Sequence, residues 1–84
     1  MDKILISFCI PTYNRAQFLG DTLNSIISQA AEDIEIVISD NASSDDTEKI
    51  VREFSQKFKN IIYFRWDENV GADLNYMKSI QKAS

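Results

Sequence analysis

Three short runs of apolar, mostly β-branched residues alternate with three helical patterns along the 84 residues, and this alternation limits the folds open to the chain. The apolar runs are Ile4–Ile10, Ile34–Ser39 and Ile61–Trp66. Such runs are typical of strands buried in a parallel sheet, with a helix crossing over after each strand. Right-handed crossovers then predict an α/β, Rossmann-like βαβαβα domain with three layers and the strand order 3-2-1.

Helical spacing of apolar residues defines the segments between and after these runs. We expect the first helix to end near residues 29–31, the second to span Thr47–Phe58, and the third to run to the end of the chain. The apolar residues that mark the three helices are Leu19, Leu23, Ile26, Ile27, Ile50, Val51, Phe54, Phe58, Leu74, Met77 and Ile80.

Polar residues at the helix ends predict specific caps. Asn14 and Gln17 have the spacing of a capping box at the start of the first helix. Tyr13 and Phe18 stand at the two positions of a hydrophobic staple around it. Asn60 is placed to cap the end of the second helix.

The acids Asp45 and Asp46 precede the second helix. Capping and interaction with the helix dipole explain this pair better than metal binding does.

Composition excludes several classes of function. The net charge of −4 leaves no basic stripe for nucleic acid, and without histidine no His-based catalysis or His-ligated zinc site exists within these residues. No apolar run approaches the roughly 20 residues that span a bilayer, and the start of the chain does not resemble a signal peptide. The single cysteine, Cys9, lies in an apolar run and is expected to be a core residue of a cytoplasmic protein.

Three polar loops follow the predicted strands, and in an open parallel sheet ligands bind at these carboxyl ends. The loops are Pro11–Asn14, Asp40–Asp46 and Asp67–Gly71. Only Gly20 and Gly71 are glycines, so the chain has neither a dinucleotide-binding glycine fingerprint nor a P-loop.

The sequences of these loops resemble the start of family-two glycosyltransferases, which have the GT-A fold. The matching segments are Ile10-Pro11-Thr12-Tyr13-Asn14-Arg15, Glu35-Ile36-Val37-Ile38-Ser39-Asp40-Asn41-Ala42-Ser43 with Asp46-Thr47, and Asn69-Val70-Gly71. They occur in the family's order and spacing along the whole chain. The segment Asn69–Asn75 also resembles the abequosyltransferase-like variant, whose members build bacterial surface polysaccharides.

The resemblance implies a donor site for a UDP-, CDP- or GDP-linked sugar. Asp40 would accept a hydrogen bond from the base, since a carboxylate suits an imide or amino N–H. Pro11, Thr12 and Tyr13 would line the base and ribose. Asn69 and Gly71 would shape the neighbouring loop, where glycine permits a tight turn and close backbone approach.

The family's metal-binding D-x-D and its catalytic base have no counterpart within residues 1–84. We therefore expect one truncated donor-binding subdomain without catalytic or metal-ligating residues of its own. The full-length enzyme would need Mn²⁺ or Mg²⁺ and a sugar or lipid-linked acceptor, and would act in the cytoplasm or at the inner face of the membrane. Without a fourth strand, Ile4–Ile10 would be a sheet edge that can pair two copies into a homodimer.

Two other interpretations stay open at this point. One is a stand-alone, non-catalytic α/β nucleotide-binding module. The other is an oligomerisation module in which the loop motif is inherited but unused.

Overall fold

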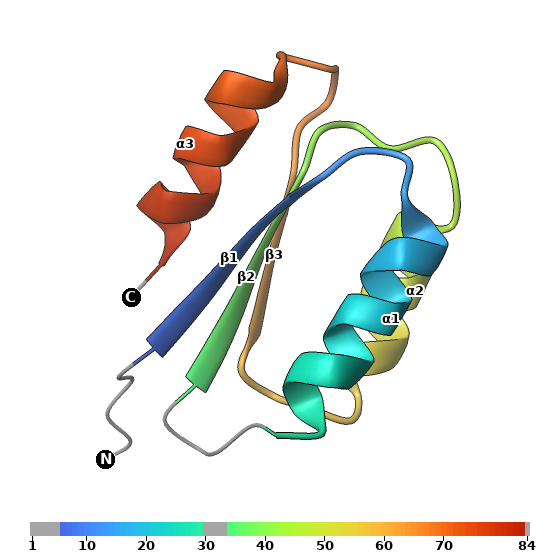
Figure 1. The fold of residues 1–84 in the computed structure, drawn as a ribbon. Coiled ribbons are helices and arrows are strands. Elements are labelled where there is room, and N and C mark those ends of the chain that lie inside the picture. Colours follow the sequence, from blue (N-terminus) through green and yellow to red (C-terminus); the bar gives the residue numbers. More distant parts are fainter. Residues whose placement is uncertain (1–5, 30–33, 84) are drawn as a thin grey trace.

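The computed structural model describes residues 6–29 and 34–83 and has the predicted alternation of strands and helices (Figure 1). Residues Ile4 and Leu5 of the first predicted strand lie outside the described residues. The elements in chain order are β1 (Ile6–Thr12), α1 (Ala16–Ile27), β2 (Ile34–Asp40), α2 (Thr47–Ser55), β3 (Ile61–Arg65) and α3 (Ala72–Lys82).

The three strands form a parallel sheet in the order β1-β2-β3, which confirms the predicted order 3-2-1. In the register, Thr12 of β1 pairs with Asp40 of β2, and Asp40 pairs with Arg65 of β3. Helices α1 and α2 cover one face of the sheet and α3 covers the other, so the domain has three layers (Figure 1). The loops after the strands therefore meet at one end of the sheet.

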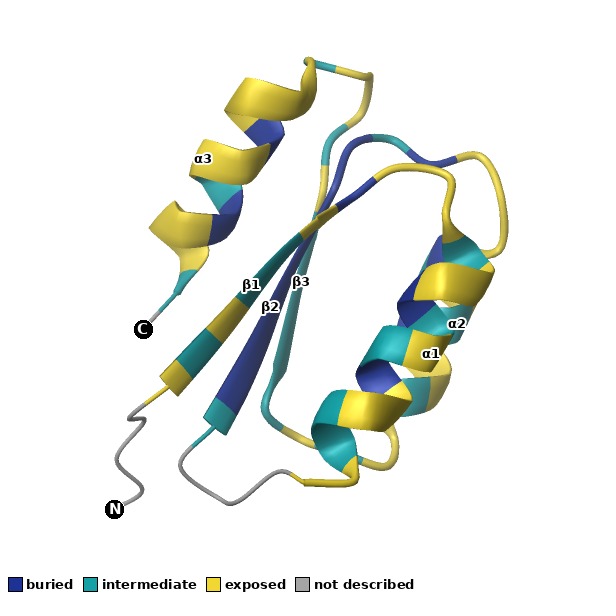
Figure 2. Cartoon of the chain, viewed as in Figure 1, coloured by how far each residue is buried: buried dark blue, intermediate teal, exposed yellow. Residues whose placement is uncertain are grey.

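The apolar core lies between the sheet and the pair α1 and α2. Five fully buried side chains form it: Leu19, Leu23, Ile36, Ile38 and Val51. Strand β2 is dark along nearly its whole length in Figure 2, as expected for the central strand of a covered parallel sheet. The predicted apolar faces of α1 and α2 are thus confirmed.

The edge strand β1 differs from the prediction in two respects. Cys9, expected in the core, is only half-buried, because β1 has a neighbour on one side alone. The predicted strand Ile4–Ile10 ends before Pro11, yet β1 continues through Pro11 to Thr12. Proline lacks the N–H of a ladder hydrogen bond, and an edge strand tolerates this loss.

Several predicted helix ends are wrong. Helix α1 begins after Arg15, and Asn14 adopts a positive φ of 48°, so the Asn14–Gln17 capping box is absent. Tyr13 and Phe18, expected to form a staple, are both exposed. Helix α1 ends at Ile27, before the predicted residues 29–31.

The second helix is also shorter than predicted. Helix α2 ends at Ser55, and the chain then turns through residues 56–60 instead of continuing the helix to Phe58. Asn60 does not cap α2, because its side-chain amide donates to the carbonyl of Ile34 at 3.2 Å. The residue instead joins the starts of β2 and β3.

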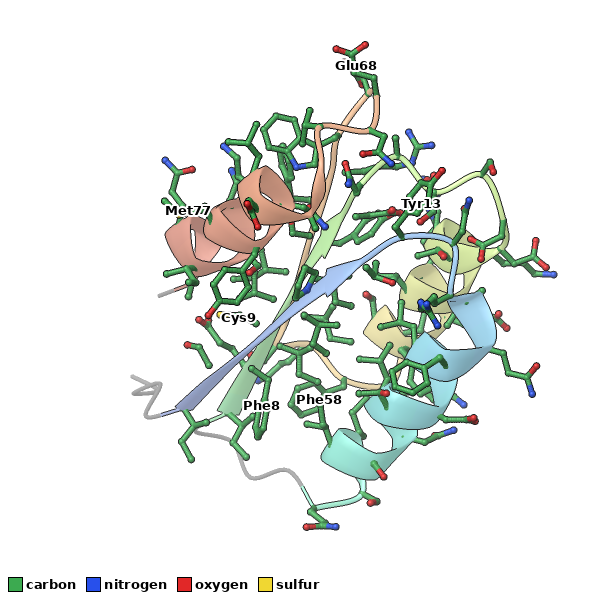
Figure 3. All side chains as sticks on the ribbon, turned by 45° about the horizontal axis from the view of Figure 1, so that its top comes forward. Phe8, Cys9, Tyr13, Phe58, Glu68 and Met77 are labelled. Atoms are coloured by element: carbon green, nitrogen blue, oxygen red, sulfur yellow. The ribbon has the colours of Figure 1, made fainter. Side chains whose placement is uncertain are left out.

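Helix α3 packs on the sheet through polar side chains. Asn75 and Ser79 are buried beneath it, whereas its apolar residues Leu74, Met77 and Ile80 are exposed. Figure 3 shows Met77 pointing away from the sheet. Within the described residues, no helix is long and apolar enough to cross a membrane.

Asn75 is the main polar anchor of α3. Its Oδ1 accepts from the Ser39 hydroxyl at 2.6 Å, and its Nδ2 donates to the Ser39 carbonyl at 2.8 Å and more weakly to the Thr12 carbonyl at 3.5 Å. One buried amide therefore connects α3 to the ends of both β1 and β2.

We predict that Asn75→Ala lowers the free energy of unfolding by about 1–3 kcal/mol, because it removes the hydrogen bonds of Asn75 to the buried hydroxyl and carbonyl of Ser39. Urea denaturation followed by circular dichroism measures the change. Gln81→Ala on the exposed side of α3 is the control and is expected to stay within about 0.5 kcal/mol of the parent. Equal effects of the two substitutions would contradict this anchoring role.

Candidate functional site

A pocket of about 510 Å³ opens at the carboxyl end of β1, between the N-terminal parts of α1 and α3. Its floor is formed by Ile10, Pro11 and Thr12. Tyr13 and Tyr76 line the pocket, with 46% and 52% of each residue exposed. The pocket thus combines a mixed apolar and polar floor with two accessible aromatic rings.

The predicted site residues divide into two groups. Pro11, Thr12 and Tyr13 line the pocket. Three further predicted residues lie beside the pocket without lining it: Asp40, Asn69 and Gly71.

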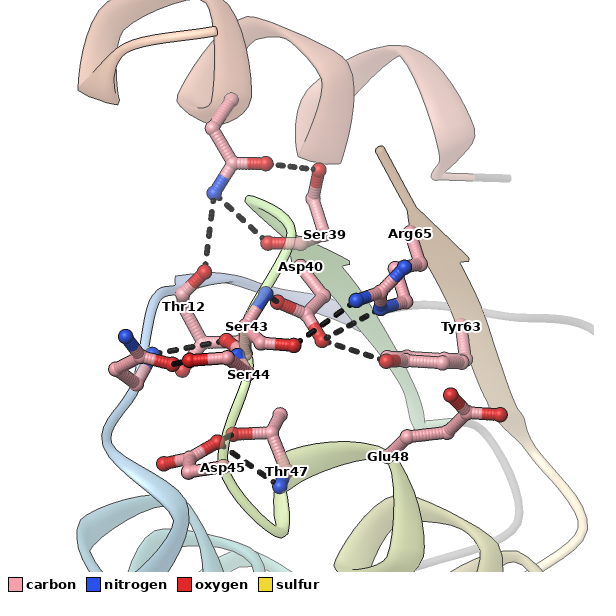
Figure 4. Close-up of polar contacts among 12 residues, drawn as sticks. Thr12, Ser39, Asp40, Ser43, Ser44, Asp45, Thr47, Glu48, Tyr63 and Arg65 are labelled. Atoms are coloured by element: carbon pink, nitrogen blue, oxygen red, sulfur yellow. Dashed lines mark hydrogen bonds and ion pairs between the residues drawn. The ribbon is translucent and has the colours of Figure 1, made fainter. Parts of the chain in front are cut away.

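Asp40 ends β2 and is completely buried (Figure 4). Its Oδ1 accepts from the backbone N–H of Ser43 at 2.9 Å, and its Oδ2 accepts from the hydroxyl of Tyr63 at 2.6 Å. The Arg65 guanidinium lies 4.0 Å from the same Oδ2 and also donates to the Ser43 carbonyl. Both carboxylate oxygens are therefore engaged within the protein.

The surroundings of Tyr63 change the pKa of its hydroxyl. Burial raises the pKa of its hydroxyl well above the usual range, and the hydrogen bond to Asp40 raises it further. The phenol consequently stays protonated at any physiological pH and remains a donor to Asp40.

The loops after β1 and β2 are joined by hydrogen bonds that we call the loop clasp, formed by Asn14, Ala16, Ser43, Ser44 and Asp45. Asn14 Oδ1 accepts from the Ser44 N–H at 2.7 Å, and the Asn14 N–H donates to Ser43 Oγ at 2.8 Å. Asp45 Oδ2 accepts from the Ala16 N–H at 3.0 Å. Asp45, in the loop after β2, thus caps α1, which begins after the β1 loop.

The predicted capping role of Asp45 is confirmed, with this additional partner. Its Oδ1 accepts from the N–H and hydroxyl of Thr47, at the start of α2 (Figure 4). Asp46 occupies the N-cap position of α2 without a side-chain cap bond. One carboxylate therefore serves the first turns of α1 and α2 together.

The N-x-G loop is organised by two asparagines. Asn69 Oδ1 accepts from the Gly71 N–H at 2.8 Å and from the side-chain amide of Asn41 at 2.9 Å. Asn41 Oδ1 accepts in turn from the N–H of Val70. Gly71 has φ 91°, which favours glycine, and the space beside it is open.

Most residues that line the pocket received no site assignment from the sequence, and Asn41, Arg15 and Tyr76 are among them. Asn41 follows Asp40 directly and lines the pocket where Asp40 does not. Arg15 lines the pocket too, and Tyr76 joins it from α3. The adjacency to Asp40 could have indicated Asn41, whereas Tyr76 depends on which face of α3 meets the sheet.

The described residues contain no group of three or more His, Cys, Asp or Glu side chains placed to hold a metal ion. Acids do occur near the site, such as Asp73 in the pocket wall, but they stand apart from one another. These residues therefore do not fit a metal on their own.

The family model for "Glycosyl transferase family 2" matches residues 7–84. The chain belongs to this glycosyltransferase family. It is 48% identical over 84 residues to abequosyltransferase RfbV of Salmonella typhimurium, a match that covers 96% of this chain and 25% of the relative. It is 30% identical over 81 residues to the putative teichuronic acid biosynthesis glycosyltransferase TuaG of Bacillus subtilis, covering 96% of this chain and 32% of TuaG.

This family-two chain also matches a solved structure, that of the mannosyltransferase PcManGT from Pyrobaculum calidifontis in complex with GDP-Man and Mn²⁺. The TM-score is 0.85 at 23% identity, and the match covers 98% of this chain and 25% of the mannosyltransferase. The predicted GT-A fold is confirmed by this likeness. The chain spans about a quarter to a third of the length of these three relatives.

We predict that Asp45 stabilises the family-two domain in a pH-dependent way. Its hydrogen bonds, led by that to Thr47, lower the pKa of the carboxyl below its ordinary value. A lowered folded-state pKa means that the contribution to stability is present above about pH 4 and is lost as the pH falls through the folded-state value.

The check compares the parent with Asp45→Asn in thermal unfolding at several pH values. The parent is expected to melt higher at pH 6, and the two curves should converge as the pH approaches 3. A difference that is constant across this range would contradict a role for the charged carboxylate. Asp46→Asn is the matched control, since its side chain makes no cap bond.

Proposed function

We propose that this chain is the nucleotide-binding first part of a glycosyltransferase that transfers a sugar from a nucleotide-sugar to an acceptor in bacterial surface-polysaccharide synthesis. The pocket at the carboxyl end of β1 carries this proposal, because it is lined by Pro11, Thr12 and Tyr13 of the family motif. The names of relatives support it further, since they include an abequosyltransferase and a putative teichuronic acid biosynthesis enzyme.

The pocket offers suitable groups for each part of a nucleoside diphosphate. Tyr13 and Tyr76 present aromatic rings on which a base can stack. Arg15 supplies a cation for the diphosphate, since guanidinium pairs well with phosphate oxygens. Thr12 and Asn41 bring polar groups to the floor, where ribose and base edges need partners.

The predicted contact between Asp40 and the base remains part of the proposal, with a structural condition attached. Asp40 already accepts from Tyr63 and Ser43 and is completely buried. Because Asp40 is completely buried, a base can reach it only after the groups that cover the carboxylate move. Asn69 and Gly71 act one step further away, because they hold the loop that leads into the α3 wall of the pocket.

A divalent metal belongs to the proposal for the longer enzyme only. The similar mannosyltransferase was solved with GDP-Man and Mn²⁺. The described residues here do not hold a metal, so its ligands and the catalytic base are proposed to come from sequence outside residues 1–84. The acceptor, a sugar or lipid-linked sugar, and a cytoplasmic or inner-membrane-face location stay predictions for the longer protein.

Calorimetric titration with UDP, CDP and GDP tests the proposed function. We expect at least one of them to bind without added metal and Asp40→Asn to weaken that binding about 10- to 100-fold if Asp40 contacts the base, since hydrogen bonds to charged groups contribute about 1.5–3 kcal/mol. Tyr63→Phe is the matched variant, because it frees one Asp40 oxygen without removing the carboxylate.

The pair of variants separates two roles of Asp40. A base contact predicts weaker binding in Asp40→Asn and unchanged or tighter binding in Tyr63→Phe. A purely architectural role predicts weaker binding in both. Absence of binding by all three nucleotides to the parent chain would overturn the donor-site proposal.

We further propose that β1 pairs two copies of the chain into a homodimer. Strand β1 lies at an edge of the sheet, with Ile6 51% and Phe8 37% exposed. Unprotected edges favour strand pairing, and an isologous contact closes on itself. Sedimentation at micromolar concentration is expected to show a dimer for the parent and a monomer for Phe8→Lys, which places a charge on the edge strand.

Leu74→Lys, on the exposed side of α3, is the control and is expected to leave the dimer intact. A monomeric parent whose amides exchange slowly along Ile6–Ile10 would refute pairing through β1.

A further inference from the structure

Hydrogen bonds fix the backbone on both sides of Tyr13, and the loop clasp provides those that follow it in the sequence. Thr12, the residue before Tyr13, is buried at the end of β1 and its carbonyl accepts from the Asn41 N–H at 2.9 Å. Asn14, the residue after Tyr13, is fixed to Ser43 and Ser44 by hydrogen bonds. Both neighbours of Tyr13 are therefore attached to the loop that follows β2.

Two residues of the joined loops have a positive φ. Asn14 has φ 48° and Ala42 has φ 62°, which are unfavourable values for residues with a side chain. Such conformations persist where the surrounding contacts fix them, and they cluster at ligand-binding sites. Asparagine tolerates this region better than most residues, which fits its position at residue 14.

Asp45 fixes the other end of the same segment. Its carboxylate accepts a hydrogen bond from the Ala16 N–H. The start of α1 therefore cannot move away from the loop after β2 without breaking this bond. Tyr13, labelled in Figure 3, lies between the attached residues Thr12 and Ala16 and lines the pocket. The geometry leaves the ring accessible while its backbone is held.

We propose that Asn14 and Asp45 are positioning residues that hold Tyr13 in the orientation required for nucleotide binding. Neither side chain lines the pocket itself, so both act through the backbone around Tyr13. This inference rests on the proposed donor site, and its test includes an arm that needs no nucleotide.

Asn14→Gly is the informative variant. Glycine adopts a positive φ without strain, so the substitution removes the side-chain bond to Ser44 and leaves the backbone conformation available. We expect binding of the best nucleoside diphosphate to weaken about three- to tenfold, as the loss of one hydrogen bond predicts. Chemical-shift titration by NMR measures this and also reports that the variant is folded.

A Tyr13→Ala background distinguishes positioning from a general structural effect. If Asn14 acts through Tyr13, Asn14→Gly should weaken binding less than about twofold once the ring is absent, because the two effects are coupled. Equal losses in the two backgrounds would overturn the proposal, as would unchanged binding in the parent background. Asp45→Ala should show the same dependence on Tyr13.

The nucleotide-free arm measures the order of the Tyr13 ring by ¹³C relaxation. Asn14→Gly is expected to loosen the ring, whereas Asn14→Asp, which keeps the acceptor oxygen for Ser44 and tolerates positive φ, should preserve its order. This result would uphold the positioning role even if the parent bound no nucleotide and the donor-site proposal failed. An unchanged ring in Asn14→Gly would overturn the positioning role whatever the binding data show.

Discussion

The arrangement of the site depends on one buried carboxylate, that of Asp40. A buried charge is costly unless polar partners surround it, and here a backbone N–H, a phenol and a guanidinium do so. Asp40 fixes the backbone N–H of Ser43 just after the end of β2, and Ser43 Oγ in turn accepts a hydrogen bond from the N–H of Asn14. The position of the β1 loop beside the pocket thus follows from contacts that begin at Asp40.

The same contacts couple distant parts of the sequence. Asp45 caps α1, which begins 29 positions earlier, and Asn75 joins α3 to the ends of β1 and β2. Parallel strands bring these segments to one end of the sheet, but hydrogen bonds between side chains and backbone determine how closely the loops approach. The pocket is therefore a product of the loop contacts as much as of the fold.

The strand order and the core faces of α1 and α2 could be predicted because apolar periodicity reports burial directly, as Leu23 and Val51 show. The capping of α1 could not be predicted, because Asn14 and Gln17 form no capping box and Asp45 caps the helix from the loop after β2. Pro11, Thr12 and Tyr13, which the sequence predicts to bind the nucleotide, line the pocket, and their contact with a ligand stays a prediction. The sequence did not show that Asp40 faces inward, because nothing in the local pattern reveals that Tyr63 and Ser43 occupy its oxygens.

Helix α3 shows why an amphipathic pattern does not by itself say which face meets the sheet. A helix normally buries its apolar stripe, yet α3 buries Asn75 and Ser79 and exposes Leu74, Met77 and Ile80 (Figure 2). The buried amide of Asn75 accepts from the Ser39 hydroxyl and donates to the Ser39 carbonyl, two hydrogen bonds that an apolar residue at that position could not make. The polar ends of β1 and β2 thus select the face of α3, and that choice brings Tyr76 to the pocket.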